Sequence, residues 1–390
     1  MRTSAMIRTG FTLILLLLLW TNAYTQIRTL NGTYVSEKAM DEFLKQQIDS
    51  GAVPGLSIAV INDGKIVFHR AIGSANLAKH TRINKSSIFE AASLSKTMFT
   101  YFVLRLVDKG ILSLDTPLHT YLPYPDIAYD ERYKLITARM VLSHTAGFPN
   151  WRTRNFADSS RNIPKGDLYL KFKPGTEFSY SGEGYYYLAK VIAQLTKNSL
   201  QTLDKLFQRE VSAPMGLPYA WFSTNPFITK HKVTGYVDEK ARDNWPASIV
   251  GQDSTWFGAA GGLHTEALTY AKFLTALMND SGLSRQSIEE FFKAQVVLSD
   301  PADHDGDTAW CLGLSVRPGL TTPDNNHRGD NGNFQSYYRI NMERKDGYVF
   351  FANSNHGGEF NEKLEVFFKK GVYAESAERF GNTGKLAVSK

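Results

Sequence analysis

Residues 93–110 read SLSKTMFTYFVLRLVDKG, and this stretch decides both the fold and the chemistry expected of the chain. From Ser93 to about Lys109 the pattern predicts a helix that is apolar nearly all round. A helix with so little polar surface is stable when it is buried in a core. Gly110 follows as the residue that ends it. Ser93 and Lys96 therefore stand at the start of a buried helix.

The spacing of Ser93 and Lys96 places both on one helix face, so the hydroxyl and the amine can approach each other. A hydroxyl becomes a good nucleophile when a base removes its proton. Lysine has a reference pKa of about 10.4, and lowering it to about 7 requires ~4–5 kcal/mol of destabilisation of the cation. The helix N-terminus also offers N–H groups to a developing anion. The alternative is a capped helix with a solvated lysine.

Outward from this helix, the chain reads as strands, then helices, then strands. Ser36 caps an earlier helix that Gly51 ends. Other stretches alternate like strands, and the first two of them are joined by a hairpin turn at 62–64. These strands are expected at Leu56–Ile61, Lys65–His69, Trp310–Arg317, Phe334–Asn341 and Gly347–Asn353, with a last helix near Glu362–Val372.

Strands at both ends of the chain can pair only if the ends meet in space, which makes the helical middle an insertion beside one sheet. A cleft between two such units is a common ligand site. The expected division is a leader (1–24), a sheet domain (25–110 and 256–376), a mainly helical domain (111–255) and a polar tail (377–390).

The first residues have the pattern of a secretory signal peptide. Arg2 and Arg8 precede an apolar run from Leu13 to Trp20, which is short for a membrane span. This predicts export to a periplasm or secretion; the alternative is an uncleaved membrane anchor. Cys311 is the only cysteine, which excludes an internal disulfide and indicates a buried thiol.

The composition narrows the possible classes of function. The chain of 390 residues is 43% hydrophobic, which excludes a disordered protein. Its net charge of +6 is dispersed along the sequence, which argues against a nucleic-acid surface. No metal site is expected, because Asp303–Asp307 lacks the glycine and glutamate positions of a calcium loop and the sequence has no zinc motif. No cofactor is expected either.

Two further motifs carry polar groups suited to acyl transfer. Tyr180-Ser181-Gly182 offers a phenol that can exchange protons with Ser93. His327-Arg328-Gly329 precedes a predicted strand, whose edge can offer an N–H group. The alternatives are an ordinary packed aromatic residue for the first motif and a surface loop for the second.

The order S-x-x-K, Y-S-x, H-x-G resembles the serine hydrolases that include class C β-lactamases, DD-peptidases and related esterases. Three other segments are similar to that family: Val53–Val60, Leu142–Gly147 and Ala260–Thr265. The resemblance implies an α+β fold, in which an antiparallel sheet is flanked by helices and carries an inserted, mainly helical domain.

The resemblance also implies residue roles. Ser93 would be the acylated nucleophile, and Lys96 and Tyr180 would share the acid and base work, with the first base left open. The backbone N–H groups of Ser93 and Asp330 would form the oxyanion hole. His327, Gly329 and the Gly182 position would line the substrate site, while His144 in the Leu142–Gly147 segment is interpreted as structural.

Two departures from the family pattern bear on the substrate. Gly182 stands where β-lactamases and peptidases carry Asn, and His327 stands where class C β-lactamases carry Lys. A neutral imidazole holds a carboxylate less strongly than an ammonium group does. Both changes favour an esterase or a D-amino-acid peptidase over an efficient β-lactamase.

The expected partner is a small or peptidoglycan-derived molecule, with membrane contact only through an uncleaved leader. The oligomeric state is left open. A second hypothesis is a receptor that binds peptidoglycan fragments or other acylating ligands without turnover, suggested by Gly182 and by the charge of Asp330.

Overall fold

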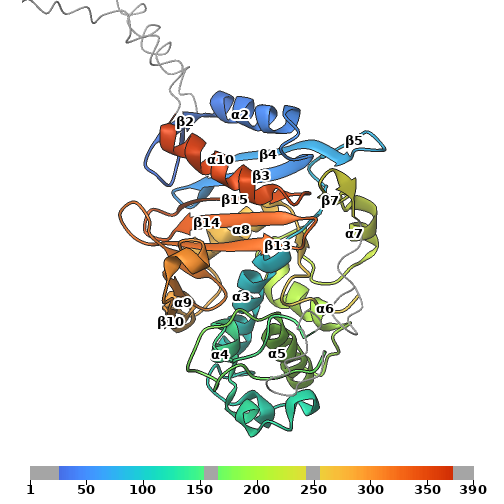
Figure 1. Ribbon diagram of the computed structural model, residues 1–390, viewed down its shortest axis with the longest axis vertical. Helices are drawn as coiled ribbons and strands as arrows, with labels where there is room; N and C mark the ends of the chain where they lie inside the picture. The colour runs from blue at the N-terminus through green and yellow to red at the C-terminus, as the bar shows by residue number, and fades with distance from the viewer. Residues whose placement is uncertain (1–25, 153–165, 243–254, 372–390) are drawn as a thin grey trace, which may run out of the picture.

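The computed structural model describes residues 26–152, 166–242 and 255–371. The predicted leader (1–24) and polar tail (377–390) lie outside these residues. Among the described residues, no helix has the length and apolar character needed to cross a membrane. Figure 1 shows a sheet with helices on both sides, above a mainly helical part.

One sheet of nine strands organises the described part of the chain, and each neighbouring pair in it is antiparallel. Its strands, in spatial order, are β10 (Val296–Val297), β11 (Ala309–Trp310), β12 (Ser315–Arg317), β13 (Asp324–Asp330), β14 (Gln335–Asn341), β15 (Asp346–Ala352), β3 (Gly55–Asn62), β4 (Lys65–Asn76) and β5 (Thr81–Arg82). β15 pairs with β3, so strands from both ends of the sequence meet as predicted.

Three short two-stranded ladders stand apart from this sheet: β1 (Gln26–Arg28) with β2 (Tyr34–Ser36), β6 (Phe89–Glu90) with β9 (His264–Thr265), and β7 (Tyr236–Val237) with β8 (Lys240–Ala241). The α-helices of the described residues are α2 (Glu37–Asp49), α3 (Ser95–Asp108), α4 (Ala138–Leu142), α5 (Gly182–Leu195), α6 (Leu203–Phe207), α7 (Pro226–His231), α8 (Ala267–Met278), α9 (Arg285–Phe292) and α10 (Gly357–Lys370).

Local sequence signals explain several element boundaries. The Ser36 hydroxyl accepts from the Ala39 N–H at the start of α2. Asp63 and Gly64 both have positive φ, the geometry of a tight turn between twisted strands, and they join β3 to β4.

One predicted strand is wrong. Trp310–Arg317 is two antiparallel strands, β11 and β12, which reverse direction at Gly313. Gly313 has a φ of 70°, and a Cβ there would lie 2.1 Å from the Thr100 hydroxyl of α3. A glycine is therefore needed for the chain to turn so close to the helix. Cys311 lies in this turn, buried, with its thiol donating to the Phe292 carbonyl.

The sheet separates two hydrophobic layers. On one face α2 packs on β4 and α10 packs on β14. On the other face α8 packs on β3 and β15, and α3 meets β14 through the hydrogen bond between the Thr97 and Tyr338 hydroxyls. β3 shows the alternation directly, because Ile58 and Val60 belong to the first layer and Ala59 and Ile61 to the second. The second layer continues without a break into α4, α5 and α6. α3 therefore lies at the junction between sheet and helical part.

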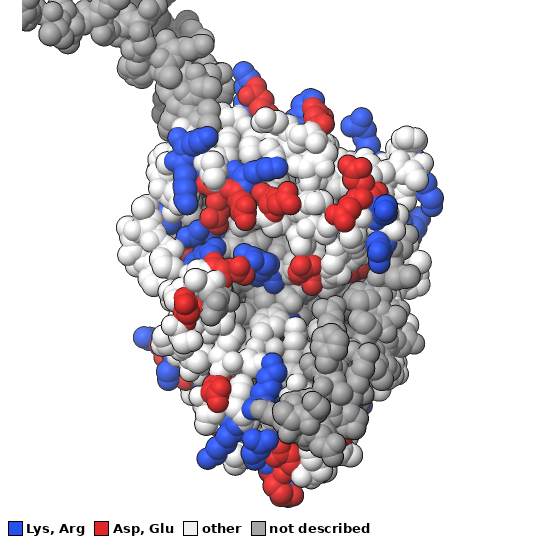
Figure 2. Space-filling view, in the orientation of Figure 1, with Lys and Arg blue, Asp and Glu red and all other residues white. Residues whose placement is uncertain are grey.

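Charge on the visible face is mixed. Figure 2 shows Lys and Arg interleaved with Asp and Glu across the sheet side of the molecule, without a broad area of one sign. This distribution agrees with the dispersed charge of the sequence.

Candidate active site

Ser93 lies on a short 3₁₀ turn, Ala92–Leu94, that leads directly into α3. Ala92 has a φ of 46°, a left-handed conformation that costs an L-residue about 1–2 kcal/mol. Between residues 91 and 100, Ser93 is the one position that is not fully buried. The strained turn thus presents the hydroxyl at the surface of an otherwise enclosed helix.

Bonds from three other parts of the chain hold this turn. The Ala91 N–H donates to the Leu263 carbonyl at 2.8 Å. The Ala91 carbonyl accepts from the Ser336 hydroxyl at 2.8 Å, and the Leu94 carbonyl accepts from the Tyr270 hydroxyl at 2.8 Å. Such over-determination by surrounding structure is what keeps a strained backbone in place.

Lys96 points back toward Ser93 from the first turn of α3. Its Nζ lies 3.1 Å from Ser93 Oγ and 2.6 Å from the carbonyl oxygen of Ala260. The side chain is 1% exposed and forms no salt bridge with any described residue. Burial without a counter-charge lowers the pKa of Lys96 to about 7. The amine can therefore be neutral near neutral pH.

Tyr180 brings its phenol to the same place from the residues just before α5. The Lys96 Nζ lies 4.6 Å from the centroid of the Tyr180 ring. Burial raises the pKa of Tyr180 well above its usual value, and the Ser93 hydroxyl partly offsets this. Tyr180 is therefore a neutral phenol at physiological pH. The structure brings together the three residues that the sequence analysis assigned to catalysis.

His144 positions the tyrosine motif. Its Nδ1 accepts from the Ser181 N–H at 3.0 Å, and its ring centroid lies 4.2 Å from that of Tyr180. The Ser181 hydroxyl in turn caps α5 by accepting from the Gly184 N–H. These contacts agree with the interpretation of His144 as a structural residue.

Gly182 is the first residue of α5, and its missing side chain has a steric explanation. A Cβ at Gly182 would lie 2.3 Å from the ring of Trp151. The Asn150 Oδ1 accepts from the Gly182 N–H at 3.0 Å. The indole therefore occupies the space that any side chain at position 182 would enter. Asn150 and Trp151 were missed by the sequence analysis, although they follow shortly after the Leu142–Gly147 segment.

Glu183, whose direction the sequence left open, points toward Arg152. Its carboxylate forms an ion pair with Arg152 at 3.0 Å, and it also accepts from the Arg152 N–H. A buried carboxylate paired in this way holds the 150–152 segment against the start of α5. We assign it no contact with substrate.

His327 and Gly329 lie within β13, so the alternative of a surface loop is wrong for this motif. His327 pairs with Tyr338 of β14, which places its side chain on the α3 side of the sheet. A Cβ at Gly329 would lie 2.5 Å from the Ala91 carbonyl oxygen. Glycine therefore lets β13 approach the turn that carries Ser93.

Arg328, within this motif, and Asp330, next to it, both have charged side chains that bond to other residues. The Asp330 carboxylate accepts from the Gly332 N–H at 2.6 Å and from the Gln335 amide at 3.0 Å. The Arg328 guanidinium pairs with Asp305 at 2.6 Å. The turn after β13 thus holds the Asp330 carboxylate. This reduces the repulsion that its negative charge would exert on an oxyanion bound at the Asp330 N–H.

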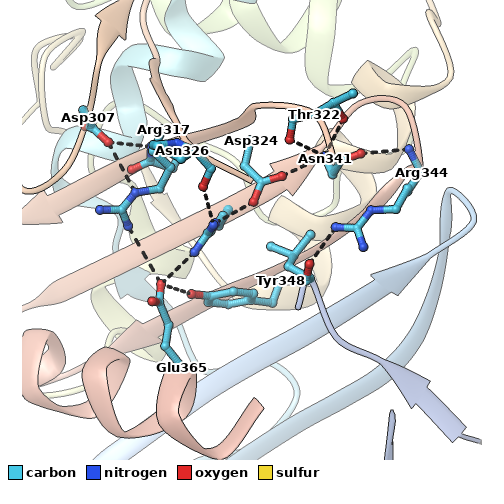
Figure 3. Close-up of polar contacts among 12 residues, drawn as sticks. Asp307, Arg317, Thr322, Asp324, Asn326, Asn341, Arg344, Tyr348 and Glu365 are labelled. Atoms are coloured by element: carbon cyan, nitrogen blue, oxygen red, sulfur yellow. Dashed lines mark hydrogen bonds and ion pairs between the residues drawn. The ribbon is translucent and has the colours of Figure 1, made fainter. Parts of the chain in front are cut away.

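A polar network on the opposite face fixes the position of β13 (Figure 3). Asp324, fully buried, accepts from Arg339 at 2.8 Å and from Asn341 at 2.8 Å. Arg339 also lies 3.4 Å from Glu365 of α10. Nearer the site, Asn326 donates to Asp307 at 2.9 Å. The network ties the strand that carries His327 to its neighbours.

Ser93, Lys96, Tyr180 and His327 open into one cavity of about 360 Å³. Its wall is strongly aromatic, because Trp151, Phe178 and Trp310 line it. The sequence analysis assigned none of these three to the site, since they come from separate segments and an aromatic residue in a loop or strand usually serves packing. Among the described residues, no group of three His, Cys, Asp or Glu side chains is arranged to hold a metal ion.

Comparisons with known proteins give consistent results. The family model named Beta-lactamase matches residues 40–367. Protein flp of Staphylococcus aureus is 23% identical over 330 residues, covering 82% of this chain and 64% of its own length, so the chain spans less than two thirds of that relative.

Solved structures show the same fold at low sequence identity. The octameric penicillin-binding protein homologue from Pyrococcus abyssi has a TM-score of 0.65 at 23% identity, covering 82% of this chain and 74% of its own. The D-amino acid amidase from Ochrobactrum anthropi SV3 has a TM-score of 0.65 at 20% identity, with coverages of 82% and 91%.

Proposed function

Because the chain belongs to the Beta-lactamase family, we propose that it is a serine hydrolase that forms an acyl-enzyme at Ser93. The observation that carries this proposal is the approach of the Lys96 Nζ to within 3.1 Å of the Ser93 Oγ in a buried setting. A neutral amine at that distance can accept the hydroxyl proton.

In the proposed acylation step, Lys96 takes the Ser93 proton while Oγ bonds to the substrate carbonyl carbon. The backbone N–H groups of Ser93 and Asp330 receive the oxyanion. The carbonyl then re-forms as the bond from its carbon to the leaving group breaks. Tyr180 gives its proton to that group, and the proton on Lys96 restores the phenol. In deacylation, a water molecule gives up a proton and its oxygen bonds to the acyl carbon. The bond from that carbon to the Ser93 Oγ then breaks, Oγ regains a proton, and the acid is released.

The pKa values favour Lys96 over Tyr180 as the first base. Burial lowers the pKa of Lys96 to about 7 and raises that of Tyr180. At neutral pH the lysine therefore supplies a free amine, whereas the phenol keeps its proton and can act as an acid. In this assignment the unprotonated amine acts as the base and the protonated phenol acts as the acid, which are their protonation states before substrate binds.

We propose that the substrate is an ester or amide of a small or cell-wall-derived molecule, and that β-lactams are poor substrates. Trp151 closes the space next to Gly182 where a side-chain amide would hold the acyl group of a β-lactam. His327, which stands in place of a lysine, is uncharged because burial lowers its pKa to about 3. The D-amino acid amidase shares the fold, which makes D-amino-acid amides reasonable members of a substrate panel.

A fluorophosphonate probe tests the nucleophile. We expect the probe to label the wild type at Ser93 and to leave Ser93→Ala unlabelled, with hydrolysis of short acyl esters lost in the variant. Ser86→Ala, which changes a partly buried serine outside the cavity, serves as the matched control. Full hydrolysis by Ser93→Ala would exclude the assignment.

The same labelled protein separates an enzyme from a receptor. Acylation with a chromogenic ester should be followed by repeated turnover if the protein is an enzyme. A stable adduct on Ser93 that never releases product would instead support the non-turnover receptor. Export, which rests on residues outside the described part, is a separate proposal that cell fractionation of the full-length chain tests.

A further inference from the structure

The orientation of His327 determines which of its ring nitrogens carries the proton. Its Nδ1 lies 2.8 Å from the carbonyl oxygen of Arg328. A carbonyl oxygen can only accept a hydrogen bond, so Nδ1 must be the protonated nitrogen. In the neutral ring, Nε2 then carries a lone pair and can only accept.

The Nε2 atom is buried and has no hydrogen-bond partner in the described part of the chain. The ring lines the cavity between Trp310, at 5.4 Å between centroids, and Tyr180, at 6.2 Å. The whole side chain is 3% exposed. Burial and the nearby Lys96 hold the pKa of His327 far below neutral, so the ring does not become a donor at Nε2. An acceptor without a partner therefore lies in the wall of the cavity, next to the rings of Tyr180 and Trp310.

The charged residues around the cavity also do not form a site that would bind a substrate carboxylate. Of the described lining residues, the cationic ones are Lys96 and Arg328, and the acidic ones are Asp305, Asp307 and Asp330. Lys96 is the proposed base, and Arg328 already pairs with Asp305. A substrate anion would meet more negative than positive charge.

We propose that His327 makes this site select esters and amides whose leaving group offers a hydrogen-bond donor, such as a carboxamide, hydroxyl or amine, and reject a free carboxylate in that position. This inference rests on the proposed function. It concerns the leaving group because the ring of Tyr180, the proposed acid for that group, is a neighbour of the His327 ring.

A carboxylate opposite Nε2 would place two hydrogen-bond acceptors against each other, after both groups had lost their bonds to water. A carboxamide of the same size can instead donate an N–H to Nε2. A buried polar group that is left unpaired costs about 1–3 kcal/mol, and each 1.4 kcal/mol is a factor of ten. We therefore expect a preference of roughly tenfold or more.

The test uses two depsipeptides that differ in one group: N-acetyl-D-alanyl-D-lactate, with a free carboxylate, and N-acetyl-D-alanyl-D-lactamide, with a carboxamide. With the full-length protein, we expect kcat/KM for the lactamide to exceed that for the lactate by roughly tenfold or more. Equal values, or a preference for the lactate, would overturn the inference.

Two variants separate recognition from a structural role. His327→Lys should reverse the preference, because an ammonium group donates to a carboxylate. His327→Gln should bring the ratio close to one, because its amide can turn to donate or to accept. If both variants lower the two rates equally and leave the ratio unchanged, His327 is structural and the inference fails.

A third substrate keeps this test separate from the proposed function. Hydrolysis of p-nitrophenyl acetate that depends on Ser93, without discrimination between the depsipeptides or with cleavage of neither, would overturn the inference alone. Absence of Ser93-dependent hydrolysis together with absence of fluorophosphonate labelling would overturn the proposed function as well.

Discussion

At the residue scale, Lys96 illustrates how position decides chemistry. The same side chain on a helix surface would be a solvated cation, whereas here it is enclosed and has a carbonyl oxygen and a hydroxyl as neighbours. Solvation of the charge is lost without a carboxylate to replace it. The sequence motif identifies the residue, and burial lowers its pKa enough for the amine to act as a base.

The lowered pKa of Lys96 predicts a pH profile. A lysine is active as a base in its unprotonated form, so kcat/KM for an acyl ester should rise with pH and level off above about 7. Below that value the amine is protonated and the rate should fall about tenfold per pH unit. A profile that is flat between pH 5.5 and 8.5, measured where the protein stays folded, would contradict the role of Lys96 as general base.

Tyr180 is expected to act through its hydroxyl. Tyr180→Phe keeps the aromatic contact with His144 and removes the acid, so kcat should fall by about 10²–10⁴-fold. Tyr186→Phe is the matched control, because Tyr186 is a neighbouring, partly buried tyrosine that does not line the cavity. Similar kinetics of the two variants in stopped-flow acylation would remove Tyr180 from the mechanism.

At the scale of elements, the start of α5 and the 150–152 segment are fitted to each other. Trp151 covers Gly182, Asn150 accepts from its N–H, and Arg152 pairs with Glu183. An asparagine introduced at position 182 therefore meets a neighbour that must move. We therefore expect that Gly182→Asn alone does not restore the family pattern at this motif.

We predict that Gly182→Asn lowers the free energy of unfolding by about 1–3 kcal/mol through overpacking and yields no gain in cephalosporin hydrolysis. The double variant Gly182→Asn with Trp151→Ala frees the space and should recover part of the lost stability. Chemical denaturation and a chromogenic cephalosporin measure the two effects. A single variant that is stable and hydrolyses cephalosporin rapidly would show that the indole moves easily.

At the scale of the whole molecule, the site depends on a strand that is held from both faces. Gly329 of β13 approaches the turn that carries Ser93, while Asp324 anchors the other face through Arg339 and Asn341. Arg339 also reaches Glu365 of α10. The outer helix and the active-site wall are therefore connected through buried polar groups.

Asp324→Ala should lower the free energy of unfolding by about 3–5 kcal/mol, because it leaves the mostly buried Arg339 without its main partner. Asp49→Ala is the control, since Asp49 belongs to an exposed pair with Lys45 that contributes about 0.5 kcal/mol at most. Urea denaturation compares the two. Equal midpoints would show that the network contributes little to stability.

The sequence by itself determined what depends on neighbours along the chain. The one-turn spacing of Ser93 and Lys96, the Ser36 cap and the Asp63-Gly64 turn are local features, and the structure shows each of them. The order of the motifs was enough to indicate the family and the antiparallel sheet between helices. It also located Tyr180 and His327 as members of one site, although their roles remain proposals.

Only the tertiary structure decided which way side chains point and how deeply they are buried. It turned Asp330 and Glu183 toward other partners, filled the Gly182 position with Trp151, and split Trp310–Arg317 into two strands. It also left the Nε2 of His327 as an acceptor without a partner. These properties depend on contacts between segments far apart in the sequence, and loss of water at a charged or polar group depends on all of those contacts together.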